Sequence, residues 1–170
     1  KAGGEETISK LLMLGAGPSE PEVRSMTIIG DVREELSKDV IAALWFLKQT
    51  AKSEELVNPE DPECEEVKEV IKPMEIIIST NGGNADEIFA IYDALRYVRE
   101  DVTVETFVVG TVRSSGTLVL SAGTKGQRRI GRHCRVMIHS VIGGSVGPMH
   151  QLDNEMKEVK AIQEAYIRAI

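Results

Sequence analysis

The chain has 170 residues, of which 42% are hydrophobic and 28% are charged, and its formal net charge is −7 at pH 7. Such a length and apolar content predict one globular domain with a proper core and exclude a disordered chain. The negative charge argues against nucleic acid and anionic membranes, because both select a basic protein face. We therefore expect no nucleic acid and no membrane among the partners.

Two cysteines, Cys64 and Cys134, stand in unrelated sequence contexts, and His133 directly precedes Cys134. The cysteines predict a reducing compartment rather than a disulfide framework. Neighbouring residues of a strand point to opposite faces, so His133 and Cys134 do not suit a shared metal ion. We expect no metal site and a cytoplasmic location, with an organelle matrix or stroma as the open alternative.

The first part of the chain predicts two helices and a strand between them. Residues 8–14 have the pattern of a short amphipathic helix, which the Gly-Ala-Gly-Pro run at 15–18 ends. Residues 26–29 predict a short strand. Ser37 is the expected N-cap of a second helix that reaches about Lys52.

Residues 53–72 differ in composition from their surroundings, because this segment contains eight acidic residues and two prolines. We interpret 53–72 as an acidic, exposed insertion loop, with one helical turn near 64–71 as a further option. Such a charge run is typical of a solvated surface.

The middle of the chain alternates between strands and helices. Residues 75–79 predict one strand, and the β-branched run 102–109 predicts another, which stops at Gly110. Between them lie Gly82 and Gly83, which permit a close backbone approach, and an amphipathic helix. This alternation predicts parallel crossovers and an α/β fold.

Ser114 follows the second of these strands at the start of a helix-compatible segment that Gly123 ends. A serine at a sharp turn from strand to helix can present its hydroxyl to a cleft that the first free N–H groups of the helix also face. The alternative is that Ser114 is only the N-cap of that helix, since serine favours this position.

The last third predicts a turn and short strand at 125–130, a strand at 135–138 that ends on His139, and a glycine-rich extended connection at 143–148. A long helix follows from residue 149 to residue 170. Its apolar residues recur near heptad spacing, which is typical of a helix that packs against another subunit.

Three features therefore lie at the carboxyl ends of predicted strands, where open α/β sheets place ligand sites. They are the pair Gly82 and Gly83, Ser114, and His139. A serine needs a base to remove its proton, and histidine is the usual one near neutral pH. The alternative for a lone histidine is a partly buried side chain with no chemical role.

The joint pattern resembles the proteolytic subunit of the Clp protease, the ClpP family, over nearly the whole chain. The motifs are the glycine pair before a helix with Ile-Tyr-Asp at 91–93, Gly-x-x-x-Ser-x-Gly at 110–116, Ala-Gly-x-Lys-Gly-x-Arg at 122–128, Arg-Val-Met-Ile-His at 135–139, and the following glycine pair at 143–144. The opening Ile-Ser-Lys-Leu-Leu at 8–12 also resembles the N-terminal helix of that family.

This resemblance implies a ClpP/crotonase-like spiral of βαβ units with a protruding handle helix, and a serine endopeptidase. Ser114 is then the nucleophile, His139 the general base, and the amides of Gly83 and Ser115 the oxyanion hole. It implies a single domain over 1–170, with its C-terminal part missing, and a handle region at 141–170.

The resemblance also implies two stacked heptameric rings, a tetradecamer of this chain, that hydrolyse unfolded polypeptides. An AAA+ unfoldase similar to ClpX or ClpA would feed substrate into the barrel. ATP would be used by that partner, so we expect no cofactor on this chain.

The sequence departs from the family pattern at several positions. No acidic residue matches the triad acid, which we expect beyond Ile170, although the alternative is a protein that lacks it. Arg113 stands where the family has a small or aromatic residue, Asn81 replaces a proline, and Ser115 replaces a methionine. Insertions around 15–24 and 53–72 leave the identity of the unfoldase open.

Two other functions remain open at this stage. One is a non-catalytic scaffold subunit of a mixed ring, which the missing acid and Arg113 favour and the retained Ser114 and His139 disfavour. The other is an acyl-CoA enzyme of the wider crotonase group. Such enzymes also stabilise an oxyanion with backbone amides but do not need Ser114 and His139 at these places.

Overall fold

The computed structural model describes residues 23–58 and 66–170. In this part of the chain a five-stranded sheet has the order β1-β4-β5-β6. The fifth strand, β7, also pairs with β5, along the part of β5 that follows its pairing with β6. All of these pairs are parallel. The strands are β1 (Ser25–Ile29), β4 (Met74–Thr80), β5 (Val104–Arg113), β6 (Arg128–Ile130) and β7 (Arg135–Met137). The expected helix at 8–14 lies outside the described residues.

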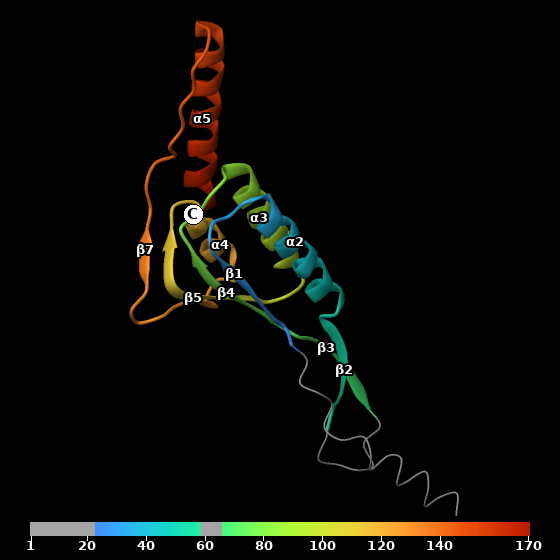
Figure 1. The fold of residues 1–170 in the computed structure, drawn as a ribbon. Helices are drawn as coiled ribbons and strands as arrows, with labels where there is room; N and C mark the ends of the chain where they lie inside the picture. Colours follow the sequence, from blue (N-terminus) through green and yellow to red (C-terminus); the bar gives the residue numbers. More distant parts are fainter. Residues whose placement is uncertain (1–22, 59–65) are drawn as a thin grey trace, which may run out of the picture.

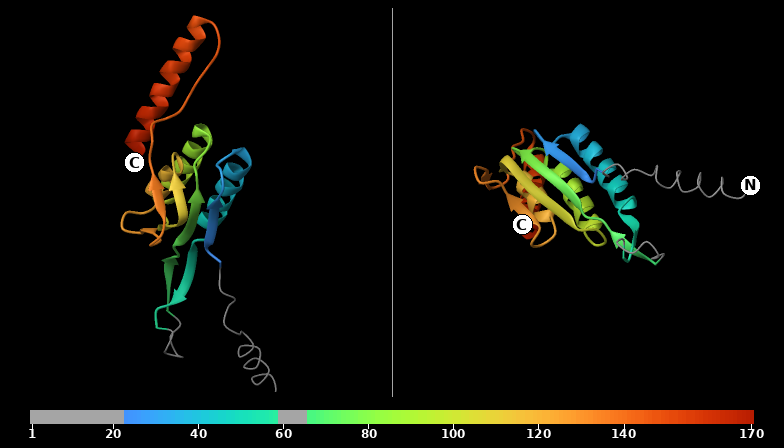
Figure 2. Two further views of the ribbon diagram at one scale, coloured as in Figure 1. Left: turned by 60° about the vertical axis from the view of Figure 1, so that its left-hand side comes forward. Right: turned by 90° about the horizontal axis from the view of Figure 1, so that it is seen from below.

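One face of the sheet carries helices α2 (Glu34–Gln49), α3 (Ala85–Val98) and α4 (Gly116–Ala122), as Figures 1 and 2 show. Along β4, buried and half-buried residues alternate, which indicates that the helices cover one face completely. The core under the helices is aliphatic, with the largest fully buried side chains including Ile76, Leu44 and Leu95. The predicted α/β class with parallel crossovers is confirmed.

The expected loop at 53–72 is a β-hairpin in the structure. Strands β2 (Lys52–Leu56) and β3 (Val67–Ile71) pair antiparallel and extend from the body below α2 (Figure 1). The prediction of a loop with a helical turn is therefore wrong where the structure describes the segment. Charge suggested solvent exposure, but β-branched residues in β3 and cross-strand pairing decided the backbone conformation. Lys52 Nζ lies 3.1 Å from Glu69 Oε1 across the pair.

The strand that was expected to stop at Gly110 continues to Arg113. Gly110 has a φ of +75°, and the pairing of β4 with β5 shifts register between Ile78 and Thr80. The glycine therefore allows an irregularity inside the strand instead of ending it. Beyond it, Thr111 to Arg113 pair with β7, which brings the segment before His139 alongside the segment before Ser114.

The start of the second helix was also predicted wrongly. Helix α2 begins at Glu34 and ends at Gln49, with Arg33 as its N-cap. Ser37 lies inside the helix, 2% exposed, and its hydroxyl donates to the carbonyl of Glu87 on α3 at 3.4 Å. A serine buried against a neighbouring helix satisfies its hydroxyl there, so its preference for helix ends does not decide its position.

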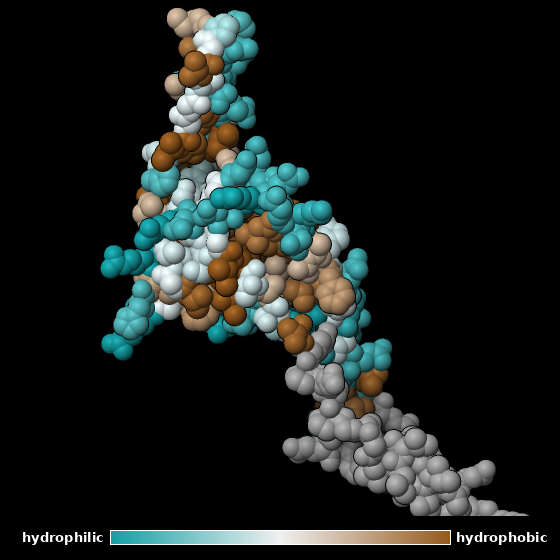
Figure 3. All heavy atoms as spheres, viewed as in Figure 1, coloured by the Kyte–Doolittle hydropathy of each residue, from teal (hydrophilic) through white to brown (hydrophobic). Residues whose placement is uncertain are grey.

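Helix α5 (Met149–Ala169) confirms the long C-terminal helix and rises from the body as an arm (Figure 1). The segment before it has no helix or strand and runs beside the arm, where Val141 N–H donates to Gln163 Oε1 at 2.6 Å. Figure 3 shows hydrophobic side chains along the arm, and Met149, Met156 and Ile167 are exposed. Within residues 23–58 and 66–170, none of the helices combines the length and the apolar content that a membrane-spanning segment needs.

Candidate active site

Ser114 occupies a strained turn between β5 and α4. Its φ is +53°, and among the described residues no other non-glycine residue has a positive φ. Such a backbone conformation costs on the order of 1 to 3 kcal/mol and persists only where the surroundings hold it. The Ser114 N–H donates to the carbonyl of Met137 on β7 at 2.8 Å. The N-cap of α4 is Ser115, so the interpretation of Ser114 as a simple N-cap is wrong.

The glycine pair packs directly against this turn. Gly82 has a φ of +90°, and a Cβ there would lie 2.9 Å from the Arg113 carbonyl oxygen, from Ser114 Cβ and from Ser115 Oγ. A side chain at Gly82 would therefore displace the serine turn. Gly83 pairs with Val32 in an isolated parallel bridge, and a Cβ at Gly83 would overlap the Val32 carbonyl oxygen. Only glycine allows three backbone segments to meet at this distance.

The residues predicted for the site come together around one cavity of about 670 Å³. Ser114, Ser115, Gly83 and His139 all line it, from the ends of three different strands. The rest of the wall is mixed: Asn81, Asn84, Ala85, Asp86, Ile88, Phe89, Arg113, Met137, Ser140, Val141, Ile142, Ile162 and Tyr166. The predicted convergence at the carboxyl edge of the sheet is thus present, while the roles of these residues remain predictions.

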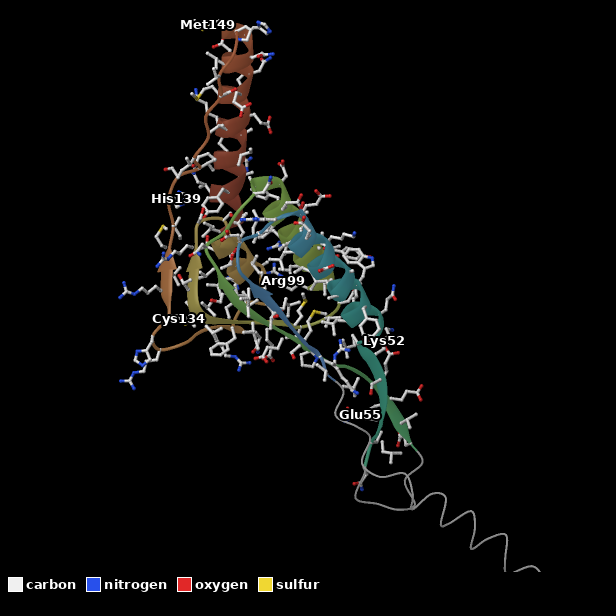
Figure 4. The ribbon with its side chains drawn as sticks, in the orientation of Figure 1. Lys52, Glu55, Arg99, Cys134, His139 and Met149 are labelled. Carbon is white, nitrogen blue, oxygen red and sulfur yellow. The ribbon has the colours of Figure 1, made fainter. Side chains whose placement is uncertain are left out.

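His139 lies two residues beyond the end of β7, near the base of the arm (Figure 4). Its Nδ1 lies 2.6 Å from the carbonyl oxygen of Ser140. A carbonyl only accepts, so Nδ1 must carry the proton in this contact, and in the neutral ring Nε2 is then free to accept. The backbone therefore selects the tautomer that a general base requires.

The two predicted oxyanion donors differ in their present state. The Ser115 N–H donates to no group in the described part of the chain. The Gly83 N–H, in contrast, donates to Ser115 Oγ at 3.1 Å, and the hydroxyl in turn lies 3.4 Å from the Gly83 carbonyl oxygen. One donor is open to a substrate oxygen, and the other becomes open when the Ser115 side chain rotates.

Arginines hold the far end of α4. Arg99 Nη1 donates to the carbonyls of Ala122 and Gly123, each at 2.9 Å, and Arg128 Nε donates to Gly123 at 2.9 Å. Burial lowers the pKa of Arg99, and the nearby cations Arg96 and Arg128 lower it further. The guanidinium still carries its charge at neutral pH, so it can bind the unsatisfied carbonyls of the helix end.

Sequence reasoning missed Tyr166 and Thr117. Thr117 Oγ1 lies 2.8 Å from the Ser114 carbonyl oxygen, and Tyr166 OH lies 2.7 Å from the same oxygen. Tyr166 looked like one more member of the apolar stripe of the last helix, because nothing in its spacing reveals a hydroxyl contact. The only available signal was a tyrosine in a stripe otherwise made of aliphatic residues and methionines.

Among the described residues, the cavity wall includes one carboxylate, that of Asp86 in the first turn of α3. No hydrogen bond or ion pair joins it to His139, whose Nδ1 is taken by the backbone. The acid that would orient the histidine therefore remains a prediction.

The parallel α/β fold thus brings a strained serine turn, a histidine and two backbone amides to one cavity. The family model for the Clp protease matches residues 64–170, and this chain belongs to that family. The fold is accordingly of the ClpP/crotonase-like type, as expected from the motifs.

Individual relatives agree with the family model. The chain is 33% identical over 141 residues to the ATP-dependent Clp protease proteolytic subunit 2 of Chlamydia pneumoniae, which covers 83% of this chain and 60% of the relative. It is 31% identical over 140 residues to the proteolytic subunit of Oltmannsiellopsis viridis, covering 82% and 62%. For subunit 1 of Gloeobacter violaceus the identity is 33% over 129 residues, covering 76% and 55%. The chain thus spans about three fifths of the length of these relatives.

Proposed function

We propose that this chain is a serine endopeptidase subunit in which Ser114 attacks the substrate and His139 is its general base. One observation carries the proposal. Ser114 has a φ of +53° and lines the same cavity as His139. Strained backbone held in place at a cavity is typical of functional residues.

In the proposed reaction, Ser114 Oγ forms a bond to the carbonyl carbon of the scissile peptide while its proton moves to His139 Nε2. The substrate oxygen takes up the negative charge and accepts hydrogen bonds from the Ser115 and Gly83 N–H groups. The C–N bond then breaks, and the leaving amine takes the proton from His139. Water cleaves the acyl-enzyme by the same route.

We further propose that the protein works as two stacked heptameric rings of this chain, a barrel into which an AAA+ unfoldase feeds unfolded polypeptide. The exposed apolar side chains Met149, Met156 and Ile167 on α5 support an assembly, because packing against another subunit would remove them from water. The relatives carry "ATP-dependent" in their names, and we assign the use of ATP to the unfoldase. We place the complex in the cytoplasm.

The decisive test is covalent labelling of the purified, assembled protein by a fluorophosphonate, followed by mass spectrometry of the modified peptide. We expect the label on Ser114, its loss in Ser114→Ala, and its retention in Ser53→Ala, a matched change on the distant hairpin strand β2. Absence of labelling on the assembled protein would contradict the proposal.

A second candidate function is a non-catalytic scaffold subunit of a mixed ring. The contact between the Gly83 N–H and Ser115 Oγ favours it, because this contact occupies one of the two oxyanion donors. The contact of His139 Nδ1 with the Ser140 carbonyl, where a triad would have a carboxylate, also favours the scaffold function. Hydrolysis of a small fluorogenic peptide by the homomeric assembly would exclude this alternative.

A further inference from the structure

Tyr166 is the one buried residue of α5, whose other residues are exposed or half-buried. It is 5% exposed. The helix touches the body near α4 and extends away from it as an arm (Figure 1). A tyrosine buried at such a contact needs a partner for its hydroxyl.

That partner is the carbonyl of Ser114. Tyr166 OH donates to this oxygen at 2.7 Å, Thr117 Oγ1 lies 2.8 Å from it, and the two hydroxyl oxygens are 2.7 Å apart. Three contacts join the two hydroxyls and the carbonyl, but only two hydroxyl protons are available for them. At most one of these protons can lie between the Tyr166 and Thr117 oxygens. Every permitted arrangement therefore leaves at least one hydroxyl proton on the Ser114 carbonyl. The N–H of Thr117 adds a donor at 3.1 Å.

Fixing this carbonyl fixes an amide as well. The peptide between Ser114 and Ser115 is planar and trans, so its oxygen and its N–H point in opposite directions. When Tyr166 and Thr117 hold the oxygen on the side of α4 and α5, the Ser115 N–H is turned to the other side. This N–H donates to no group among the described residues, and Ser115 lines the cavity with Ser114 and His139. Rotation of the peptide would instead aim a carbonyl oxygen at the developing negative charge.

We propose that Tyr166 is a positioning residue. Together with Thr117, its hydroxyl holds the Ser114–Ser115 peptide in the orientation that offers the Ser115 N–H to the substrate oxygen. This inference rests on the proposed function. It also links the docking of α5 to the oxyanion site, since Tyr166 is the residue through which the arm hydrogen-bonds the serine turn.

The test is Tyr166→Phe, which removes the hydroxyl and keeps the ring that packs against the core. We expect kcat for a fluorogenic peptide to fall roughly tenfold with unchanged KM, because the lost interaction acts on the transition state. The affinity for a peptide boronate, whose tetrahedral adduct places an oxygen in the same site, should weaken by a similar factor. The melting temperature and the assembly mass should stay the same, which a merely structural role would not predict.

Tyr97→Phe is the matched control, since Tyr97 is half exposed on α3 and stacks on Trp45 away from the cavity. It should retain kcat and boronate affinity. A Tyr166→Phe protein with kcat and boronate affinity within about twofold of the parent would overturn the inference.

Hydrogen exchange separates this outcome from failure of the proposed function. The Thr117 N–H donates to the same carbonyl, so its exchange should accelerate in Tyr166→Phe and remain unchanged in Tyr97→Phe. If the parent protein neither hydrolyses peptide nor reacts with a fluorophosphonate, the function fails. In that case, unchanged exchange of the Thr117 N–H in Tyr166→Phe would overturn the positioning role as well. Accelerated exchange would show that the Tyr166 hydroxyl holds the serine turn even without catalysis.

Discussion

The backbone N–H of Gly83 donates a hydrogen bond to the side-chain oxygen of Ser115, with 3.1 Å between the nitrogen and the oxygen. Both residues were predicted to supply backbone donors to the same oxyanion. If the proposed function holds, the Ser115 hydroxyl occupies the place that the substrate oxygen takes beside Gly83. The substrate then has to displace this hydroxyl before both donors can act together.

Replacing Ser115 by alanine removes the competing hydroxyl and leaves both backbone N–H groups. We expect Ser115→Ala to raise kcat for a fluorogenic peptide about threefold to tenfold, because the Gly83 N–H no longer exchanges one partner for another. The helix should not suffer, since the Ser115 side chain makes no capping bond to α4. Steady-state kinetics measure kcat of Ser115→Ala, with Ser53→Ala as the control that should keep the parent value. A fall in kcat for Ser115→Ala would show that the hydroxyl assists the reaction.

His139→Ala removes the proposed base. Without it, fluorophosphonate labelling of Ser114 should slow at least about a hundredfold, because the serine proton has no acceptor in place. His133→Ala is the control, since His133 is exposed on the connection between β6 and β7. Equal labelling rates in the two variants would rule out His139 as the base.

Two glycines allow backbone strain to be separated from crowding of the serine turn. Gly82 and Gly126 have nearly the same φ, +90° and +88°, but a Cβ at Gly82 meets the turn at 2.9 Å while one at Gly126 meets nothing within 4 Å. We expect Gly126→Ala to lower the free energy of unfolding by about 1 kcal/mol and to keep activity.

Gly82→Ala should lower the free energy of unfolding by more, roughly 2 to 4 kcal/mol, and should abolish peptide hydrolysis. Urea denaturation and peptide hydrolysis of both variants provide the comparison. Equal losses would indicate that the turn accommodates a methyl group and that its geometry is less tightly set than the structure shows.

Arg99→Met removes the donor that binds the last carbonyls of α4 and keeps much of the aliphatic stem. We expect the free energy of unfolding to fall by about 1 to 3 kcal/mol, since the Ala122 carbonyl loses its charged donor while the Gly123 carbonyl keeps that of Arg128. Arg96→Met replaces an exposed arginine of α3, the helix that Arg99 caps, and should change the free energy of unfolding by less than about 0.5 kcal/mol.

The effect of Arg99→Met should not depend on pH near neutrality. Burial lowers the pKa of Arg99, so the folded state holds this proton less tightly than the unfolded state does. The linkage acts only near the pKa of the group, and arginine is protonated in both states between about pH 6 and pH 8. Denaturation curves of the parent and Arg99→Met between about pH 6 and pH 8 test this expectation. A difference in unfolding free energy that changes with pH across this range would contradict it.

Local pattern predicted the regular part of the fold. The apolar stripe of α5 and the apolar face of α3 recur with helical spacing along the chain, and β4 contains a short apolar run. The resulting order of strands and helices implies parallel crossovers. The hairpin of β2 and β3 escaped prediction because its strands are stabilised by cross-strand partners such as Lys52 and Glu69, which are not neighbours in sequence. Gly110 was taken for the end of a strand because a bulge and a stop have the same local signal.

By itself the sequence predicted that four residues lie together at one edge of the sheet. Ser114, His139, Gly83 and Ser115 each follow a strand of a parallel sheet, and parallel strands end at a common edge. Tertiary structure alone decided how these groups are connected: that Ser115 Oγ accepts from Gly83, that the Ser140 carbonyl selects the tautomer of His139, and that Tyr166 reaches the Ser114 carbonyl from a helix 52 residues away. The physical reason is that a hydrogen bond depends on the distance and direction between two atoms. Side-chain rotation and the packing of distant elements set both of these, and neither leaves a period or a spacing in the sequence.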